Sequence, residues 1–273
     1  MFNSLSEDFE MKKNFLLCLG NQKCGTSWLY QYLMNQENFN GGFLKEYHIW
    51  DALDIPILSR NKIIKYENKS QKLRYRMQTE QNFYFEYFDS LYSDLINLTA
   101  DITPSYSGLT KKRLEFIKTS FESKEIEVKV IILIREPLNR IKSAVRFNLD
   151  RKNFAEGIKK GVSDFTTALE QYYTNEHCKI RTNYDRIINN AYEVFVKENI
   201  YVGIYENMFF PAQINELSKF LDIKFDSDFG KVLVNKTRNK VSNTLIDKDI
   251  TLFYSNVYTF CFNKFPITQE LWQ

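Results

Sequence analysis

The first residues with chemical potential lie in a loop bounded by Gly20 and Gly25. The loop continues as GNQKCGTS, which approaches the Walker A pattern G-x-x-x-x-G-K-[ST], but Thr26 stands where that pattern requires lysine. Its lysine is instead Lys23, which together with Thr26 and Ser27 can contact one anion. A loop between a buried strand and a helix start directs backbone N–H groups and the helix dipole at such an anion. The loop therefore predicts a phosphate site, although a tight turn with an exposed lysine fits it equally well.

A second basic position follows another apolar run, VKVIILI, which ends just before Arg135. Parallel sheets bind ligands at the carboxyl ends of their strands, where Arg135 is expected to lie. On the helix predicted to begin near Pro137, Arg140 and Ser143 have i, i+3 spacing, so Arg135 and Ser143 are expected to converge on a second anion. The alternative is a surface ion pair of Arg135 with Glu136 or Asp101. Two anion sites at neighbouring strand ends indicate a ligand with two separated phosphates.

The elements that must position these residues alternate along the chain. Apolar runs at 14–19, 128–134 and 200–205 predict buried strands, and a helical pattern follows each of them. Thr26 or Ser27 is placed to start the first of these helices. This alternation favours a single α/β domain with a P-loop-like central parallel sheet flanked by helices.

Three segments carry weaker patterns. Residues 59–80 are rich in lysine and arginine and predict a basic helix, and residues 83–92 (FYFEYFDSLY) form an aromatic stripe. A solvated helix with a core-facing stripe is the preferred interpretation, and a direct role in substrate binding is the alternative. Beyond about residue 224 we expect irregular structure with a late helix.

Composition excludes several function classes. The chain has 273 residues with 37 basic and 34 acidic side chains, a balance that does not indicate a nucleic-acid binder. The four cysteines form no CxxC pair, and only His48 and His177 add imidazoles, so we expect no metal site. No apolar run approaches a membrane span, and a reducing cytoplasm is the expected location. Residues 1–13 are interpreted as a leader and 14–273 as the domain.

At this point the motifs resemble those of a known family. KCGTSWL at residues 23–29 resembles the 5′-phosphosulfate loop of sulfotransferases, K-x-G-T-[TS]-[WL]-L. REPLNRIKS at 135–143 is similar to their 3′-phosphate element, R-x-P-x-x-R-x-x-S, with the same spacing. The resemblance implies 3′-phosphoadenosine 5′-phosphosulfate (PAPS) as the sulfuryl donor. It implies a donor site formed by Lys23, Cys24, Gly25, Thr26, Ser27, Trp28, Arg135 and Ser143, with core packing the preferred role for Trp28.

Further segments resemble the glycosaminoglycan or carbohydrate branch of that family. LKEYHIWD at 44–51 looks like K-E-x-H-[FY]-[FW]-D, in which the glutamate is the catalytic base. The resemblance implies Glu46 as the base and Lys45 as a group that orients the acceptor or the sulfuryl oxygens. His48 is the competing base, because small-molecule sulfotransferases use histidine. DITPSY at 101–106 and IYENM at 204–208 are similar to two more family segments, so the likeness spans roughly residues 14–225.

The sequence also departs from that pattern. Ile102 stands where those enzymes commonly carry lysine, which argues against an anionic, heparan-like acceptor. NKTRNK at 235–240 is a weak match to the basic residues that close over PAPS, with Lys236 and Arg238 as candidates. A solvated basic turn is the alternative there.

The resemblance thus implies in-line transfer of a sulfuryl group from PAPS to a hydroxyl or amine, with a glycan or small saccharide as the expected acceptor. A sulfuryl group bears less charge than a phosphoryl group, so a metal is not required. One alternative is a non-catalytic protein that binds PAPS or a polyanion. A less favoured one is a degenerate P-loop kinase, which lacks the motif lysine at 26 and a Walker B aspartate after residues 128–134.

Overall fold

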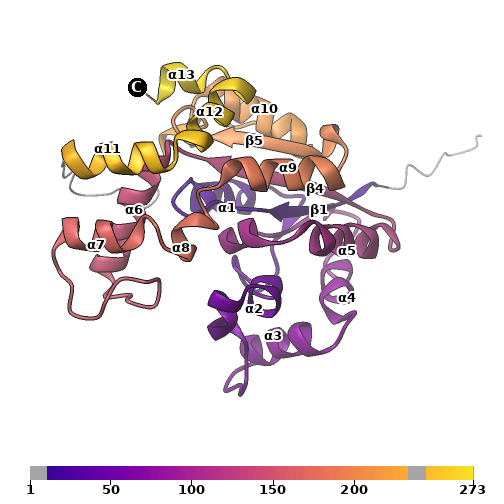
Figure 1. Cartoon of the computed structure of the whole chain (residues 1–273). Helices are drawn as coiled ribbons and strands as arrows, with labels where there is room; N and C mark the ends of the chain where they lie inside the picture. Colours follow the sequence, from indigo (N-terminus) through magenta and orange to yellow (C-terminus); the bar gives the residue numbers. More distant parts are fainter. Residues whose placement is uncertain (1–10, 233–243, 273) are drawn as a thin grey trace, which may run out of the picture.

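The fold is built on a five-stranded parallel β-sheet, seen in a computed structural model that describes residues 11–232 and 244–272. The strand order is β2-β3-β1-β4-β5, and every neighbouring pair is parallel. The sheet and the helices around it are shown in Figure 1. The strands are β1 (Lys13–Cys18), β2 (Phe39–Asn40), β3 (Leu98–Asp101), β4 (Ile126–Ile134) and β5 (Ile200–Ile204).

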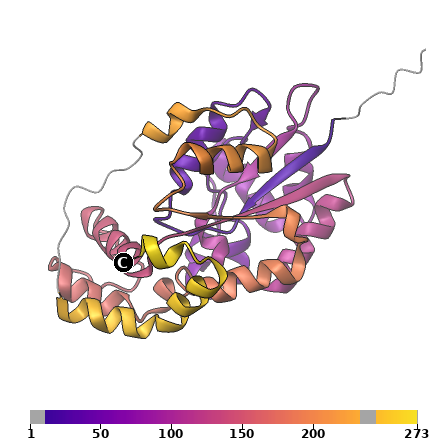
Figure 2. The same ribbon diagram turned by 90° about the horizontal axis from the view of Figure 1, so that it is seen from above.

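Helices cover both faces of the sheet, as Figure 2 shows from above. They are α1 (Thr26–Met34), α2 (Trp50–Asp54), α3 (Lys69–Thr79), α4 (Phe83–Asp89), α5 (Lys111–Glu122), α6 (Pro137–Asp150), α7 (Phe165–Tyr172), α8 (Glu176–Lys179), α9 (Tyr184–Val194), α10 (Pro211–Leu221), α11 (Thr244–Phe253), α12 (Ser255–Lys264) and α13 (Thr268–Leu271). Short 3₁₀ turns occupy Pro56–Asn61, Pro104–Gly108, Lys197–Asn199 and Ser227–Lys231.

The alternation of side chains along β1 divides the core into two layers. Phe15 and Leu17 pack with α4, α5 and α9, whereas Leu16 and Cys18 pack with α1 and α10. All four side chains are fully buried, as expected for a central strand with helices on both faces. The predicted α/β fold with a parallel sheet is therefore confirmed.

The strand order places a topological switch point between β1 and β4. The chain leaves β1 toward β2 on one side, and it leaves β4 toward β5 on the other. At such a point the loops after the two strands diverge and leave a crevice at the carboxyl edge of the sheet. The loop at residues 19–25 and the turn at 135–136, which carry the predicted anion sites, both border this crevice.

The predicted strands at 14–19, 128–134 and 200–205 are present, but the short strands β2 and β3 were not predicted. β2 has only two residues, and β3 (LTAD) lacks a distinctive apolar run. The aromatic stripe faces the core as preferred, since Tyr84, Phe85 and Phe88 of α4 are buried.

The expectation for the C-terminal part was wrong. In place of one late helix, the described residues from 244 onward form three helices, α11, α12 and α13. Ile250, Tyr254 and Cys261 bury their side chains against the rest of the core, which explains why this part is ordered. Across the described ranges, none of the helices combines the length and apolar character needed to cross a bilayer.

Candidate functional site

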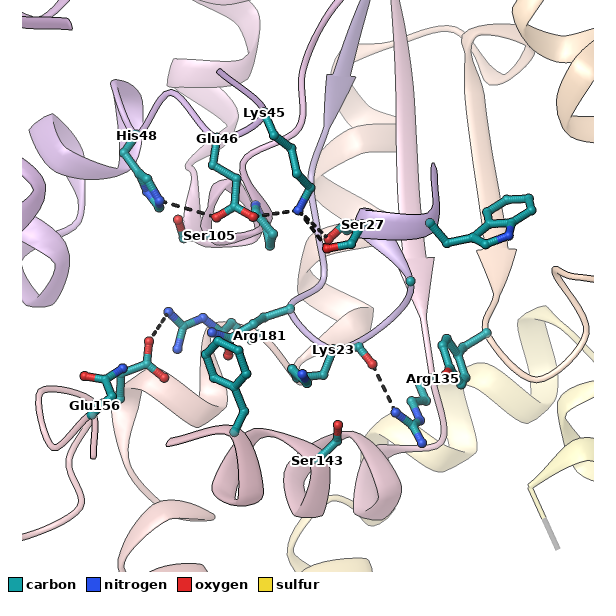
Figure 3. Close-up of a pocket in the computed structure, with 18 of the residues that line it drawn as sticks. Lys23, Ser27, Lys45, Glu46, His48, Ser105, Arg135, Ser143, Glu156 and Arg181 are labelled. Carbon is teal, nitrogen blue, oxygen red and sulfur yellow. Dashed lines mark hydrogen bonds and ion pairs between the residues drawn. The ribbon is translucent and has the colours of Figure 1, made fainter. Parts of the chain in front are cut away.

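A cavity of about 550 Å³ opens at the carboxyl edge of the sheet, at the switch point between β1 and β4. Figure 3 shows that side chains from distant parts of the sequence converge there. Among those brought together are most of the predicted residues: Lys23, Gly25, Thr26, Ser27, Trp28, Lys45, Glu46, His48, Arg135 and Ser143. The cavity has the size expected of a small-molecule site.

The loop after β1 presents the start of α1 to this cavity. Gly25 precedes the helix with a φ of 97°, a left-handed conformation that favours glycine. A Cβ at this position would lie 2.8 Å from the sulfur of Met208, so side chains larger than hydrogen are also excluded by packing. Thr26 and Ser27 therefore begin the helix at the cavity, where their free backbone N–H groups suit an anion.

Lys23 is the cation of this loop. Its backbone has a φ of 70°, and its Nζ lies 4.4 Å from the centre of the Phe147 ring on α6. Burial lowers the pKa of Lys23, and the neighbouring Arg135 guanidinium lowers it further. Among the described residues it forms no ion pair, which is the state expected of a cation that awaits an anionic ligand.

Two residues of the predicted donor set point their side chains into the core. Cys24 is fully buried, and burial raises the pKa of its thiol to about 12. Trp28 borders the cavity, but its ring is 2% exposed, stacks on Tyr32 and donates from Nε1 to the Phe229 carbonyl at 3.2 Å. A side-chain contact of Cys24 with the donor is thus ruled out by burial, and Trp28 has the preferred packing role.

Arg135 follows β4, as predicted, and Ser143 faces the same cavity from α6 (Figure 3). The Arg135 guanidinium donates to the Lys23 carbonyl at 3.2 Å and lies 4.3 Å from the centre of the Tyr205 ring. It makes no ion pair with Glu136 or Asp101, so the alternative of a surface pair is wrong. Nε of Arg135 is buried without a partner in the described structure, which leaves a donor for a ligand.

Arg140 does not join this group. It is fully buried and donates to the sulfur of Cys178 at 3.0 Å, with its guanidinium 5.9 Å from the Tyr172 ring centre. Arg140 lies one turn before Ser143 on α6, at a level where the helix packs against α7 and α8 and not against the cavity.

Lys45 connects the anion loop with the predicted base. Its Nζ donates to Oγ1 of Thr26 and to Oγ of Ser27, each at 3.3 Å, and to Oε1 of Glu46 at 2.6 Å. One ammonium group therefore contacts both the helix start and the carboxylate.

Glu46, His48 and Asp51 form a chain of charged groups. Nε2 of His48 lies 3.5 Å from Oε2 of Glu46, and Nδ1 of His48 donates to Oδ2 of Asp51 at 2.7 Å. Burial alone would lower the pKa of His48, but its bonds to Asp51 and Glu46 outweigh burial and raise that pKa to about 9. Burial alone would raise the pKa of Glu46, but the bond with His48 and the charge of Lys45 lower it to about 2. At neutral pH the imidazole is thus charged and the carboxylate is free of its proton.

The loop that carries these residues is held from two sides. The Thr103 hydroxyl accepts backbone N–H bonds from Tyr47 at 2.9 Å and from His48 at 3.3 Å, and it donates to Asp101 at the end of β3. From α3, Arg74 donates to the Tyr47 carbonyl at 2.6 Å. The basic segment predicted at 59–80 therefore supports the loop through α3, in addition to being partly solvated.

Sequence reasoning missed several residues that line the cavity. Ser105 donates to Asp51 at 2.5 Å, and Asn61 donates to the same oxygen at 3.2 Å. On the wall of the cavity that faces Glu46 and His48, the Glu156 carboxylate contacts the guanidinium groups of Arg60 and Arg181. Asp51 and Ser105 belonged to quoted motifs, and Arg60 and Asn61 lie in the basic segment at 59–80, for which a role in substrate binding was the alternative. No local pattern marked Glu156 or Arg181. Lys236 and Arg238 lie outside the described residues.

The crevice at the switch point holds a glycine loop and two cations without a carboxylate partner among the described residues. A family model described as the sulfotransferase domain matches residues 13–252, which is most of the chain. The protein therefore belongs to the sulfotransferase domain family.

The solved structures include similar folds. A sulfotransferase from Alicyclobacillus acidocaldarius is 18% identical, with a TM-score of 0.58, covering 90% of this chain and 93% of that chain. The sulfotransferase domain of the Synechococcus PCC 7002 olefin synthase is 16% identical, with a TM-score of 0.49, covering 80% of this chain and 77% of that chain. No match was found among curated protein sequences.

Proposed function

We propose that this protein transfers a sulfuryl group from PAPS to a hydroxyl or amine of an acceptor. The proposal rests on which of the cations around the cavity have a carboxylate partner and which do not. Among the described residues that line it, Lys23 and Arg135 are the cations without a carboxylate partner, and both lie beside the start of α1. A ligand with two phosphate groups compensates both charges.

Each group at this end of the cavity has a role in donor binding. Lys23 stabilises the charge that develops on the 5′-phosphate and on the bridging oxygen as the sulfuryl group departs. Thr26 and Ser27 hold the same phosphate with hydroxyl and backbone N–H groups. Arg135 and Ser143 hold the 3′-phosphate, a group that ATP does not have.

Glu46 is the proposed base. During transfer, the acceptor oxygen or nitrogen forms a bond with sulfur, the bond from sulfur to the bridging oxygen breaks, and the acceptor proton moves to Glu46. His48 is already protonated at neutral pH, because its pKa is about 9, so it has no lone pair to accept this proton. A carboxylate with a pKa of about 2 accepts the proton late, when the new bond has made the acceptor acidic.

Lys45 is proposed to compensate negative charge on the sulfuryl group, and His48 is proposed to orient the Glu46 carboxylate. Lys45 contacts Glu46 and Ser27, so its ammonium group is placed to stabilise sulfuryl oxygens between the two. His48, held by Asp51, keeps the Glu46 carboxylate in one orientation. These assignments distinguish an enzyme from a protein that only binds PAPS, for which a fixed base beside the anion loop has no purpose.

The proposed acceptor is a carbohydrate, either a glycan or a small saccharide. Short neutral polar side chains, Asn61, Ser105 and Asn153, line the cavity. These side chains suit the hydroxyl groups of a sugar. The four cysteines are buried and unpaired, which agrees with the proposed cytoplasmic location.

The test is transfer of label from PAPS labelled in its sulfuryl group to a panel of glycosides, phenols and amines. The proposal predicts labelled product with at least one glycoside, and a loss of about 10²-fold or more in the Lys23→Ala variant. The matched control is Lys118→Ala on α5, which lies outside the cavity and should retain activity. Equal labelling by Lys23→Ala and the unaltered protein would contradict the proposal, as would magnesium-dependent binding of ATP in place of PAPS.

A further inference from the structure

The cavity is electrostatically divided into two ends. Lys23 and Arg135, at one end, have no carboxylate partner among the described residues. At the other end, every described cation lies within 4.0 Å of a carboxylate: Lys45 and His48 pair with Glu46, and Arg60 and Arg181 pair with Glu156. The first end thus holds two cations with no carboxylate beside them, whereas at the second end three carboxylates, counting Asp51 beside His48, offset most of the charge of four cations.

Glu156 is the centre of the wall that faces Glu46 and His48 across the cavity (Figure 3). Its Oε1 accepts from Nη2 of Arg181 at 3.0 Å and lies 3.5 Å from Nη2 of Arg60. Its Oε2 accepts from Nδ2 of Asn148 at 3.2 Å. The side chains of Glu156 and Arg181 are each 4% exposed, so this carboxylate is held in place by its partners.

The group has more hydrogen-bonding capacity than its internal contacts use. Nε of Arg181 is buried without a partner in the described structure. A carboxylate accepts about four hydrogen bonds, and Glu156 has three donors within reach. These side chains place hydrogen-bond acceptors (the Glu156 oxygens) and donors (the arginine nitrogens) within a few ångströms of one another. Adjacent hydroxyl groups of a ligand suit this arrangement, because each hydroxyl both donates and accepts.

From this arrangement we propose that Arg60, Glu156 and Arg181 form the acceptor subsite, and that this subsite selects a neutral, hydroxyl-rich acceptor over an acidic one. The inference rests on the proposed sulfuryl transfer from PAPS and narrows its acceptor class. Glu156 accepts hydrogen bonds from hydroxyls of the acceptor, and Arg60 donates to them. An acidic group placed on this wall meets the Glu156 carboxylate, and both guanidiniums beside it already contact that carboxylate.

The test uses two matched probes, p-nitrophenyl β-glucoside and p-nitrophenyl β-glucuronide, which differ by one carboxylate. Their affinities are measured by calorimetric titration of the protein saturated with adenosine 3′,5′-bisphosphate, so that no turnover occurs. The unaltered protein is expected to bind the glucoside about tenfold more tightly. Glu156→Gln leaves Arg60 and Arg181 without a carboxylate partner. In this variant the affinity for the glucuronide is expected to increase about tenfold, so that the preference for the glucoside disappears.

A second variant guards against misfolding, because Glu156→Gln leaves a buried guanidinium without its partner. Arg60 is 39% exposed on its side chain, so Arg60→Gln preserves the fold. Arg60→Gln is expected to weaken glucoside binding severalfold and to weaken glucuronide binding even more, so that the preference for the glucoside increases. The control is Glu122→Gln, whose side chain is 51% exposed on α5 and which should bind both probes as the unaltered protein does.

The outcomes separate this inference from the proposed function. If the unaltered protein binds adenosine 3′,5′-bisphosphate but binds the glucuronide as tightly as the glucoside, or binds neither, the inference is wrong and the donor assignment stands. A preference that neither variant changes also overturns it. Failure to bind adenosine 3′,5′-bisphosphate at all overturns the proposed function itself.

Discussion

Glu46 and His48 face each other across 3.5 Å, with Oε2 of the carboxylate directed at Nε2 of the imidazole. Because His48 is held on its other side by Asp51, the pair fixes which residue can accept a proton. The imidazole is the charged partner below about pH 9, and the carboxylate is the free base. The proposal that Glu46 is the base rests on this relationship.

Replacing the base should abolish turnover without affecting donor binding. In Glu46→Gln we expect kcat to fall by about 10²- to 10⁴-fold, because the amide cannot accept the acceptor proton. Affinity for adenosine 3′,5′-bisphosphate should stay the same, since Lys23 and Arg135 are unchanged. Single-turnover transfer from labelled PAPS measures the first quantity, and calorimetry measures the second. Full turnover in Glu46→Gln combined with loss in His48→Ala would assign the base to His48.

The His48 contacts should also give the folded state a specific pH dependence. The pKa of His48 is raised from 6.5 to about 9, so its stabilising contribution is complete below about pH 6.5 and is lost as the pH rises through about 9. The contribution is about 3 kcal/mol in the free energy of unfolding. Urea unfolding of the unaltered protein and of His48→Gln, at about pH 6 and about pH 10, measures it. A stability difference that does not shrink between these pH values would contradict the ion pairs.

Gly25 should tolerate no side chain. Gly25→Ala is expected to lower the free energy of unfolding by about 1 to 3 kcal/mol, since the backbone is left-handed and the new Cβ meets Met208. Gly161→Ala is the matched control, because Gly161 has a φ of 92° but no atom within 4 Å of an added Cβ. Thermal unfolding should therefore show a larger loss for Gly25→Ala. Equal losses would mean that packing against Met208 does not constrain the loop.

Arg135 should discriminate between nucleotides by their 3′-phosphate. Arg135→Ala is expected to weaken binding of adenosine 3′,5′-bisphosphate by about 10- to 100-fold, the value of a charge-assisted hydrogen bond, and to affect AMP much less. Arg113→Ala, which removes a guanidinium paired with Asp54 outside the cavity, is the control. Equal losses for the two nucleotides would argue against a 3′-phosphate contact.

The sequence carried enough information to predict the three longest strands and the place of Lys23 and Arg135 at the edge of the sheet. The reason is that Arg135 directly follows one strongly apolar strand and Lys23 lies in the glycine-bounded loop after another, so their place is set by local pattern. The short strands β2 and β3 lacked such a pattern, and the C-terminal helices bury Tyr254 and Cys261 against partners far away in sequence.

The acceptor end could not be predicted for a related reason. Glu156 lies in an irregular segment and Arg181 just beyond α8, and their pairing depends on how α6, α7 and α8 pack together. Arg140 illustrates the same limit, because it belongs to the motif that resembles the 3′-phosphate element, yet tertiary packing buries it beside Cys178. Local spacing determined which helix face each residue occupies, and only the fold determined what that face meets.

The proposed function requires the cavity to bind a nucleotide through both its 5′- and its 3′-phosphate. Calorimetric titration of the unaltered protein with adenosine 3′,5′-bisphosphate in the presence of a chelator, beside a titration with ATP and magnesium, measures this. We expect tight, metal-independent binding of the bisphosphate and far weaker binding of ATP. Tight binding of ATP that requires magnesium, with none of the bisphosphate, would contradict the proposed function.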